Sequence, residues 1–261
     1  MHIGRFFVLL GGKNMEKELV FYERIGNWDF SKIKYHEKIL EDEFCFYDWV
    51  KYFVDENTSV LDLGTGGGEA VLKNFPKAKR IVGIDFSKEM IKTAIKSLEE
   101  SERKNDNITF LCMDTNSLNF EENEFDVITA RHTVLNVNEI KRVLKPGGIL
   151  IIEGVAKDDC LELKDKVGRG QCYFDEKAIE DIEYDELMNE KFENVEKKYM
   201  LLNEWYHSEE DFYALLFKTP IIENINENDL IKINEYVREN IVSGNIKLLR
   251  KIYGFVVKNI K

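Results

Sequence analysis

VLDLGTGGGE (residues 60–69) decides the fold, because it joins an apolar run to a cluster of glycines. The apolar half predicts a buried strand, and the glycines predict a tight turn into a helix. Glycines in such a turn let a ligand approach the main chain without a Cβ atom in the way. Glu69 stands where a dinucleotide-binding G-x-G-x-x-G turn carries its third glycine, which disfavours a pyrophosphate cradle. Alone, this turn predicts only a nucleotide-type ligand.

Acidic side chains stand at the ends of three successive predicted strands. Asp62 lies directly before the glycine turn, where a carboxylate suits the ammonium of an amino-acid ligand. Asp85 follows about twenty residues beyond Gly64, where an acidic side chain can bridge two ribose hydroxyls. Asp114 ends the third strand and can receive the exocyclic amine of adenine. We therefore expect the three strand ends to surround one nucleoside.

Strand and helix patterns alternate around this turn. Strands are predicted over residues 59–63, 80–85, 108–114, 125–130 and 148–152. Between the second and third strands, Ser87 can cap a helix. Alternation of this kind favours a parallel, doubly wound α/β sheet.

The flanking segments are predicted from their periodicity. Residues 36–54 carry apolar side chains at helical spacing and predict an amphipathic helix. Residues 157–190 are polar and are predicted as loop. The C-terminal part is predicted as strand, helix, helix and strand, over residues 195–205, the segment between Ser208 and Pro220, and residues 229–241 and 246–257. The pattern Ser208-x-x-Asp211 predicts a capping box at the start of the first of these helices.

Composition limits the class of protein. The chain has 261 residues, 44% of them hydrophobic, which suits one compact domain with a modest elaboration. Its net charge of -12 disfavours nucleic acid and anionic membranes as partners, although lysines gather near residues 73–80 and 141–145. No apolar run is long enough to span a bilayer. The four cysteines form no CxxC pair, so we expect reduced thiols in a cytoplasmic protein.

The motifs together resemble class I S-adenosylmethionine-dependent methyltransferases over residues 58 to about 153. They are D-x-G-x-G-x-G, G-x-D-x-S, the acidic third strand end, F-D-V-I and R-V-L-K-P-G-G. The resemblance implies a Rossmann-like doubly wound seven-stranded sheet whose last strand is antiparallel, with an N-terminal helical lid and an insertion after the fifth strand. It implies S-adenosylmethionine as cofactor, S-adenosylhomocysteine as product and no metal. Thr65 stands where the family often has cysteine or serine.

The same resemblance implies roles for individual residues. Asp62 and Gly64 would hold the methionine end of the cofactor, Asp85 the ribose, and Arg131 would lie near the methionyl portion. Met113 would cover the adenine ring, although a plain core methionine explains it nearly as well. The predicted cofactor-binding residues are Asp62, Gly64, Thr65, Gly66, Asp85, Phe86, Met90, Met113, Asp114, Thr115 and Arg131.

No catalytic residue is predicted on the acceptor side. Methyl transfer is an in-line displacement at a sulfonium, so alignment matters most and a general base is optional. His132 and Glu153 lie near the predicted site, and for each a base and a structural role remain open. Arg169 can grip an acidic acceptor or belong to a surface turn.

The sequence divides into a lid and one methyltransferase domain. Residues 1–35 are predicted as an N-terminal segment that folds over the site, and residues 36–261 as the domain. The cofactor core is predicted over residues 58–153 and the acceptor-side region over residues 154–261. We further hypothesise that residues 1–14 are translated upstream sequence and that the native start is Met15.

The predicted function is methylation of a small molecule on oxygen or nitrogen, by a monomer or homodimer. An RNA or protein methyltransferase is the first alternative and would need an exposed basic stripe. A nicotinamide-dependent oxidoreductase or a non-catalytic cofactor-binding module is the second, and Glu69 argues against the oxidoreductase.

Overall fold

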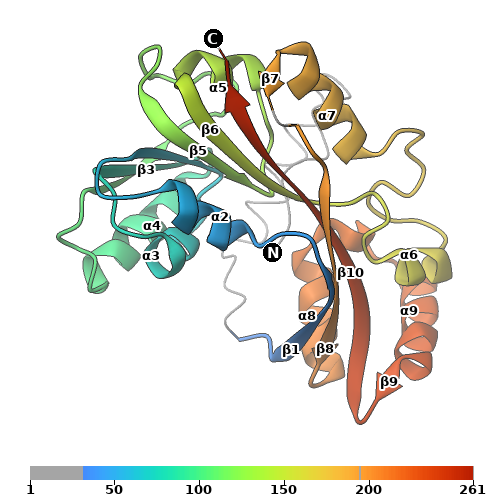
Figure 1. The fold of residues 1–261 in the computed structure, drawn as a ribbon. Coiled ribbons are helices and arrows are strands. Elements are labelled where there is room, and N and C mark those ends of the chain that lie inside the picture. Colours follow the sequence, from blue (N-terminus) through green and yellow to red (C-terminus); the bar gives the residue numbers. More distant parts are fainter. Residues whose placement is uncertain (1–31, 194, 261) are drawn as a thin grey trace.

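A computed structural model describes residues 32–193 and 195–260 of the chain. Within these residues a ten-stranded sheet runs in the order β1-β8-β10-β6-β5-β2-β3-β4 (Figure 1), with β7 and β9 paired to β10. The five predicted strands of the cofactor core are present and mutually parallel. Their bounds are β2 (Ser59–Leu63), β3 (Arg80–Asp85), β4 (Ile108–Cys112), β5 (Phe125–Arg131) and β6 (Leu144–Val155).

Helices cover both faces of these parallel strands. The core on one face gathers Val50, Val71 and Ala94 from α2 (Phe46–Phe53), α3 (Glu69–Asn74) and α4 (Lys88–Glu100). The core on the other face gathers Ile140 and Leu187 from α5 (Val137–Val143) and α7 (Ile179–Asn189). Because both faces of the parallel strands are buried, their sequences are nearly continuous apolar runs. The predicted doubly wound, Rossmann-like α/β arrangement is confirmed.

The long C-terminal strand reverses the direction of the sheet. β10 (Asn245–Asn259) pairs antiparallel with β6, as predicted for the last strand. The predicted count of seven strands was wrong for the described sheet, which has ten. The three additional strands are β1 (Tyr35–Asp42), β7 (Phe192–Glu193) and β9 (Ile241–Val242), each of which extends an edge or a strand end.

Part of the sheet projects beyond the carboxyl ends of the parallel strands. Ile252 of β10 pairs with Val155 at the end of β6, so residues 245–251 continue past that edge. There β10 pairs with β8 (Lys198–Tyr206), which in turn pairs with β1. We call residues 35–42, 198–206 and 245–251 the projecting sheet; it occupies the lower half of Figure 1. Ligands of open α/β sheets bind outside these same carboxyl ends.

Three helices give the projecting sheet a core of its own. They are α6 (Leu161–Val167), α8 (Glu209–Lys218) and α9 (Glu227–Glu239). Leu163, Phe212 and Tyr236 from these helices pack with Tyr206 and Leu248 from the strands. Ser208 caps α8 by accepting a hydrogen bond from the backbone N–H of Asp211, as predicted. A short 3-10 turn (Pro220–Ile222) follows α8.

Two predictions of secondary structure were wrong. The helix predicted over residues 36–54 is helical only in α2, because residues 35–42 pair with β8 as an edge strand. The apolar spacing of that segment fits a helix, but pairing with a neighbouring strand overrides such local patterns. The loop predicted over residues 157–190 contains α6 and α7. α7 was missed because it buries Glu180 and Glu183, so its helical apolar stripe is interrupted.

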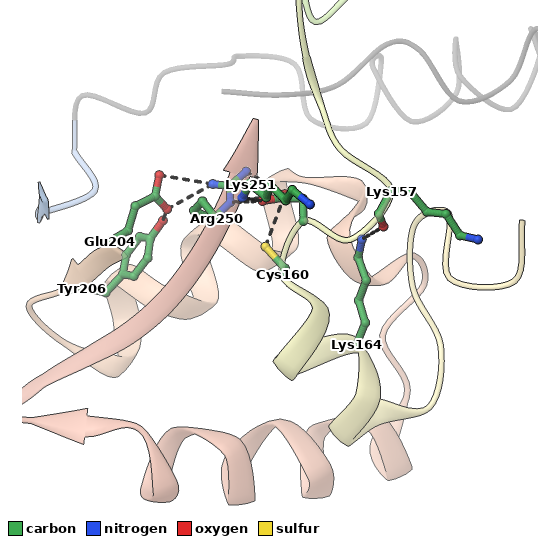
Figure 2. A network of polar contacts seen from close by, with 8 residues as sticks. Lys157, Cys160, Lys164, Glu204, Tyr206, Arg250 and Lys251 are labelled. Atoms are coloured by element: carbon green, nitrogen blue, oxygen red, sulfur yellow. Dashed lines mark hydrogen bonds and ion pairs between the residues drawn. The ribbon is translucent and has the colours of Figure 1, made fainter. Parts of the chain in front are cut away.

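A buried charge network ties the projecting sheet to the loop after β6 (Figure 2). Arg250 donates from Nε and Nη2 to Asp159, at 2.9 and 3.0 Å, and from Nη1 to Glu204 at 3.1 Å. Tyr206 donates its hydroxyl to Glu204 at 2.5 Å. The charged groups are 2 to 9% exposed. One guanidinium therefore balances two buried carboxylates that come from different parts of the chain.

The N-terminal segment lies outside the described residues. The predicted lid is therefore untested, apart from residues 32–35, which lead into β1. Among the described helices none is both long and apolar enough to cross a bilayer. All four cysteines are free thiols.

Candidate active site

The glycine turn takes the left-handed conformation at three positions. Gly64, Gly66 and Gly68 have φ values of 71°, 57° and 79°, which strain any residue with a Cβ. A Cβ on Gly64 would lie 2.6 Å from the Cβ of Thr133, so this glycine also permits close packing on the loop after β5. A Cβ on Gly66 would meet nothing within 4 Å. The turn thus presents its backbone at Gly66 to open space.

Asp85 joins the glycine turn to the end of β3. Its Oδ2 accepts the backbone N–H of Gly66 at 3.1 Å, and its Oδ1 accepts that of Ser87 at 2.8 Å. Burial raises the pKa of Asp85, and these two hydrogen bonds act against that rise. Each carboxylate oxygen can accept a further hydrogen bond. The side chain therefore fixes the turn while keeping acceptors for a ligand.

Asp62 is a buried carboxylate beneath the same turn. Its side chain is only 5% exposed, and its Oδ1 accepts the hydroxyl of Thr129 at 2.7 Å. Burial raises the pKa of Asp62 to about 6, against the opposing effect of the Thr129 hydrogen bond. Thr129 was missed by the sequence analysis because a threonine inside a strand carries no signal of its own.

The raised pKa of Asp62 gives a testable pH dependence. Because the folded pKa of about 6 exceeds the model-compound value of 3.8, this group stabilises the ligand-free fold at low pH. That contribution is complete below the unfolded pKa and is lost as pH rises through 6. The resemblance implies that Asp62 receives the ammonium of the ligand, which needs the ionised carboxylate. We therefore expect S-adenosylhomocysteine affinity to fall about tenfold between pH 7.5 and 5. Calorimetric titration at both pH values measures it; an unchanged affinity would contradict it.

Arg131 and its neighbours form the centre of the carboxyl edge. Arg131 donates from Nε to Glu153 Oε1 at 2.7 Å, and its guanidinium lies 5.6 Å from the ring centre of Tyr47. His132 Nε2 lies 2.8 Å from the same Oε1. Burial lowers the pKa of Arg131, but Glu153, Tyr47 and Asp62 together outweigh burial, and the net shift of the pKa is upward. Tyr47 of α2 was missed because its helical spacing indicated only core.

The third strand end is more open. Met113 is half-buried against the core, and its Sδ lies 3.4 Å from the backbone N of Asn119. Asp114 is exposed, and its Oδ1 accepts both the backbone and the side-chain N–H groups of Asn116. Four predicted residues remain. Phe86 is 38% exposed and Met90 is buried in α4. Thr65 follows the end of β2, and Thr115 follows the end of β4.

The structure brings the predicted carboxylates to one edge of the sheet. Asp85 accepts a hydrogen bond from the glycine turn, and Asp62 precedes that turn on β2 and acts electrostatically on Arg131. Asp114 lies one strand beyond Asp85, because β3 and β4 are paired. Arg169 does not join this group: it donates to Asp229 and to the carbonyl of Glu223 within the acceptor-side region.

A doubly wound sheet with a glycine turn and paired carboxylates at its carboxyl edge places this chain among the Rossmann-like proteins. Its sequence matches the family model described as "Methyltransferase domain" over residues 54–216, more than half of the chain. The chain therefore belongs to this family, that of the class I S-adenosylmethionine-dependent methyltransferases.

Two curated relatives each match less than half of the chain. An uncharacterized methyltransferase, YcgJ of Bacillus subtilis, is 33% identical over 108 residues, 38% of this chain and 42% of the relative. A demethylmenaquinone methyltransferase of Lactococcus lactis is 35% identical over 103 residues, 36% of this chain and 40% of the relative. The matches thus span about two fifths of the relatives' length.

Solved structures share the fold over more of the chain. The crystal structure of B. subtilis YcgJ superposes with a TM-score of 0.58 and 19% identity, covering 83% of this chain and 98% of that one. The [4+2]-cyclase SpnF superposes with a TM-score of 0.58 and 17% identity, covering 99% of both chains. At these identities the likeness shows the fold alone.

Proposed function

We propose that this protein transfers the methyl group of S-adenosylmethionine to a small molecule, with the cofactor bound at the edge formed by Asp62, Asp85 and Arg131. The observation that carries the proposal is that a buried carboxylate, Asp62, and an arginine, Arg131, lie on paired strands next to a glycine turn that faces open space. A zwitterionic amino-acid end needs one group of each sign.

The residues present fit this cofactor. The open space at Gly66, which a Cβ would begin to fill, suits a ligand packed against the backbone. Asp62 would receive the ammonium of the methionyl end, with Gly64 at its side, and Arg131 would face the carboxylate. Asp85 would receive the ribose hydroxyls, and Asp114 and Met113 the adenine, with Phe86, Met90, Thr65 and Thr115 around them.

The cofactor supplies an activated methyl group on a sulfonium, and this chain's residues bind and align it. Asp62 would pull the amino-acid end toward β2, while Asp85 would hold the ribose at β3. Because β2 and β3 are paired, the two carboxylates stand on adjacent strands and fix the cofactor along the sheet edge. No group of this chain needs to form a covalent bond.

The projecting sheet is the proposed acceptor side. Burial raises the pKa of Tyr35, Glu204 raises it further, and Arg131 opposes this rise. The same arginine acts on Glu37. Tyr35 and Glu37 of β1 are therefore near the cofactor edge, and we infer that the acceptor lies between them and Arg131.

The charge distribution supports a small acceptor over RNA. The lysine-rich patches near residues 73–80 and 141–145 were the candidate basic stripe. Arg80 pairs with Glu124 at 2.7 Å, and Lys145 pairs with Asp126 at 2.7 Å. Arg142 pairs with Glu139 at 2.8 Å. These cations are balanced by neighbouring carboxylates, so they offer little attraction to a phosphate backbone.

Methyl transfer from labelled cofactor tests this proposal. The protein is incubated with methyl-labelled S-adenosylmethionine and an extract of the source cells, and the products are separated by size. We expect label in the small-molecule fraction, with heat-denatured protein as the control. Label confined to precipitated RNA or protein would contradict the small-molecule acceptor and favour the alternative acceptor class.

A further inference from the structure

Arg131, the last residue of β5, and His132, which follows it, both approach one carboxylate oxygen of Glu153. Side chains of consecutive residues in a strand point to opposite faces of the sheet. Arg131 Nε and His132 Nε2 nevertheless lie 2.7 and 2.8 Å from Glu153 Oε1. The convergence is possible because His132 has a φ of 55°, which turns the chain out of the strand conformation.

The backbone of His132 is held in this conformation at a cost. A left-handed conformation is unfavourable for a residue with a Cβ. The backbone N–H of His132 donates to the carbonyl of Glu153 at 2.8 Å, which secures the turn. Both side chains are buried, at 6 and 4% exposure. Such strain persists where the surroundings enforce it, and it clusters at functional sites.

Glu153 fixes the orientation of the Arg131 guanidinium group. The carboxylate accepts from Nε, and the guanidinium plane lies near the ring of Tyr47. The arginine side chain remains 28% exposed. His132 Nε2 approaches the same Oε1, so Arg131 and His132 share the one carboxylate. Within the described residues Arg131 donates from Nε, and its Nη groups remain for another anion.

We propose that Glu153 and His132 are positioning residues that orient Arg131 toward the carboxylate of the cofactor's methionyl end. This inference rests on the proposed function. It assigns the pair to recognition of the amino-acid end, whereas Asp85 and the β4 edge would recognise the nucleoside. Loss of the pair should therefore weaken ligands that carry the amino acid and spare ligands that lack it.

The test compares two ligands with the full chain by calorimetry. S-adenosylhomocysteine carries the amino-acid end, and 5′-methylthioadenosine lacks it. We expect Glu153→Gln to weaken S-adenosylhomocysteine about tenfold, the loss of one well-placed charged contact. Binding of methylthioadenosine should change less than about twofold. An equal loss for both ligands, or no loss for either, would overturn the assignment.

A second variant and a matched control distinguish loss of the proposed contact from misfolding. His132→Asn removes the imidazole but keeps a residue that tolerates positive φ, and we expect the same selective loss. Asp229→Asn breaks a similarly exposed arginine pair, 33 and 4% against 28 and 6%, away from this edge. It should leave both affinities unchanged. If the unmodified protein binds neither ligand, the proposed function itself is rejected; a uniform loss in the variants rejects only the positioning role.

Discussion

Replacing Arg250 with methionine is expected to lower the free energy of unfolding by about 3–5 kcal/mol. The substitution leaves Asp159 and Glu204 buried without their shared cation, while methionine fills most of the lost volume. A buried ion pair adds little stability compared with an apolar pair of the same size. Removing one partner of the pair, however, leaves the other charge buried and uncompensated in the protein interior. The loss should also loosen the projecting sheet, because Arg250 links its strands to the loop after β6.

Denaturant unfolding of the variant measures this loss. Arg80→Met is the matched control, since Arg80 pairs with Glu124 at a site where the side chains are 32 and 22% exposed. An exposed pair of that kind contributes about 0–1 kcal/mol. Equal losses in the two variants would show that burial of the Arg250 network has no special importance.

Replacing Asp62 with asparagine is expected to have opposite effects on binding and on stability. Asparagine keeps an acceptor for the Thr129 hydroxyl but carries no charge to attract an ammonium, so S-adenosylhomocysteine affinity should fall about a hundredfold. The free protein should melt at a higher temperature at pH 7.5, because the cost of burying a carboxylate whose pKa is raised to about 6 disappears. Binding sites commonly give up stability for function.

Calorimetry and thermal melts of Asp62→Asn test both parts. Asp229→Asn gives the opposite sign as a control, because Arg169 lowers the pKa of Asp229 and its ionised form stabilises the fold. That variant should melt at a lower temperature at the same pH. A destabilised Asp62→Asn protein that still binds the ligand would contradict the role assigned to this carboxylate.

The cofactor half of the molecule was largely predictable from the sequence. The strand before Gly64 is marked by its apolar residues, and the turn after it is marked by its glycines. Asp85 follows Gly64 at the distance along the chain that one helix and one strand require. Local patterns suffice there because each motif residue lies at a strand end. The acceptor-side helices α8 and α9 were also found, because Ser208 and the apolar spacing mark them.

The rest depends on contacts between distant segments. β1 forms only because residues 35–42 meet β8, more than 150 residues later in the chain, as with Tyr35 and Tyr206. Arg250 meets Asp159 across 91 positions, and no local pattern marks such a partner. The convergence of Arg131 and His132 on Glu153 needs a left-handed histidine, which sequence patterns do not reveal. Tertiary pairing decided each of these features.

Calorimetric titration of the unmodified protein with S-adenosylhomocysteine and with NAD tests the central claim most directly. One molecule of S-adenosylhomocysteine should bind per chain at pH 7.5, and NAD should give no heat of binding. Saturable binding of NAD with no response to S-adenosylhomocysteine would contradict the assignment of this edge of the sheet.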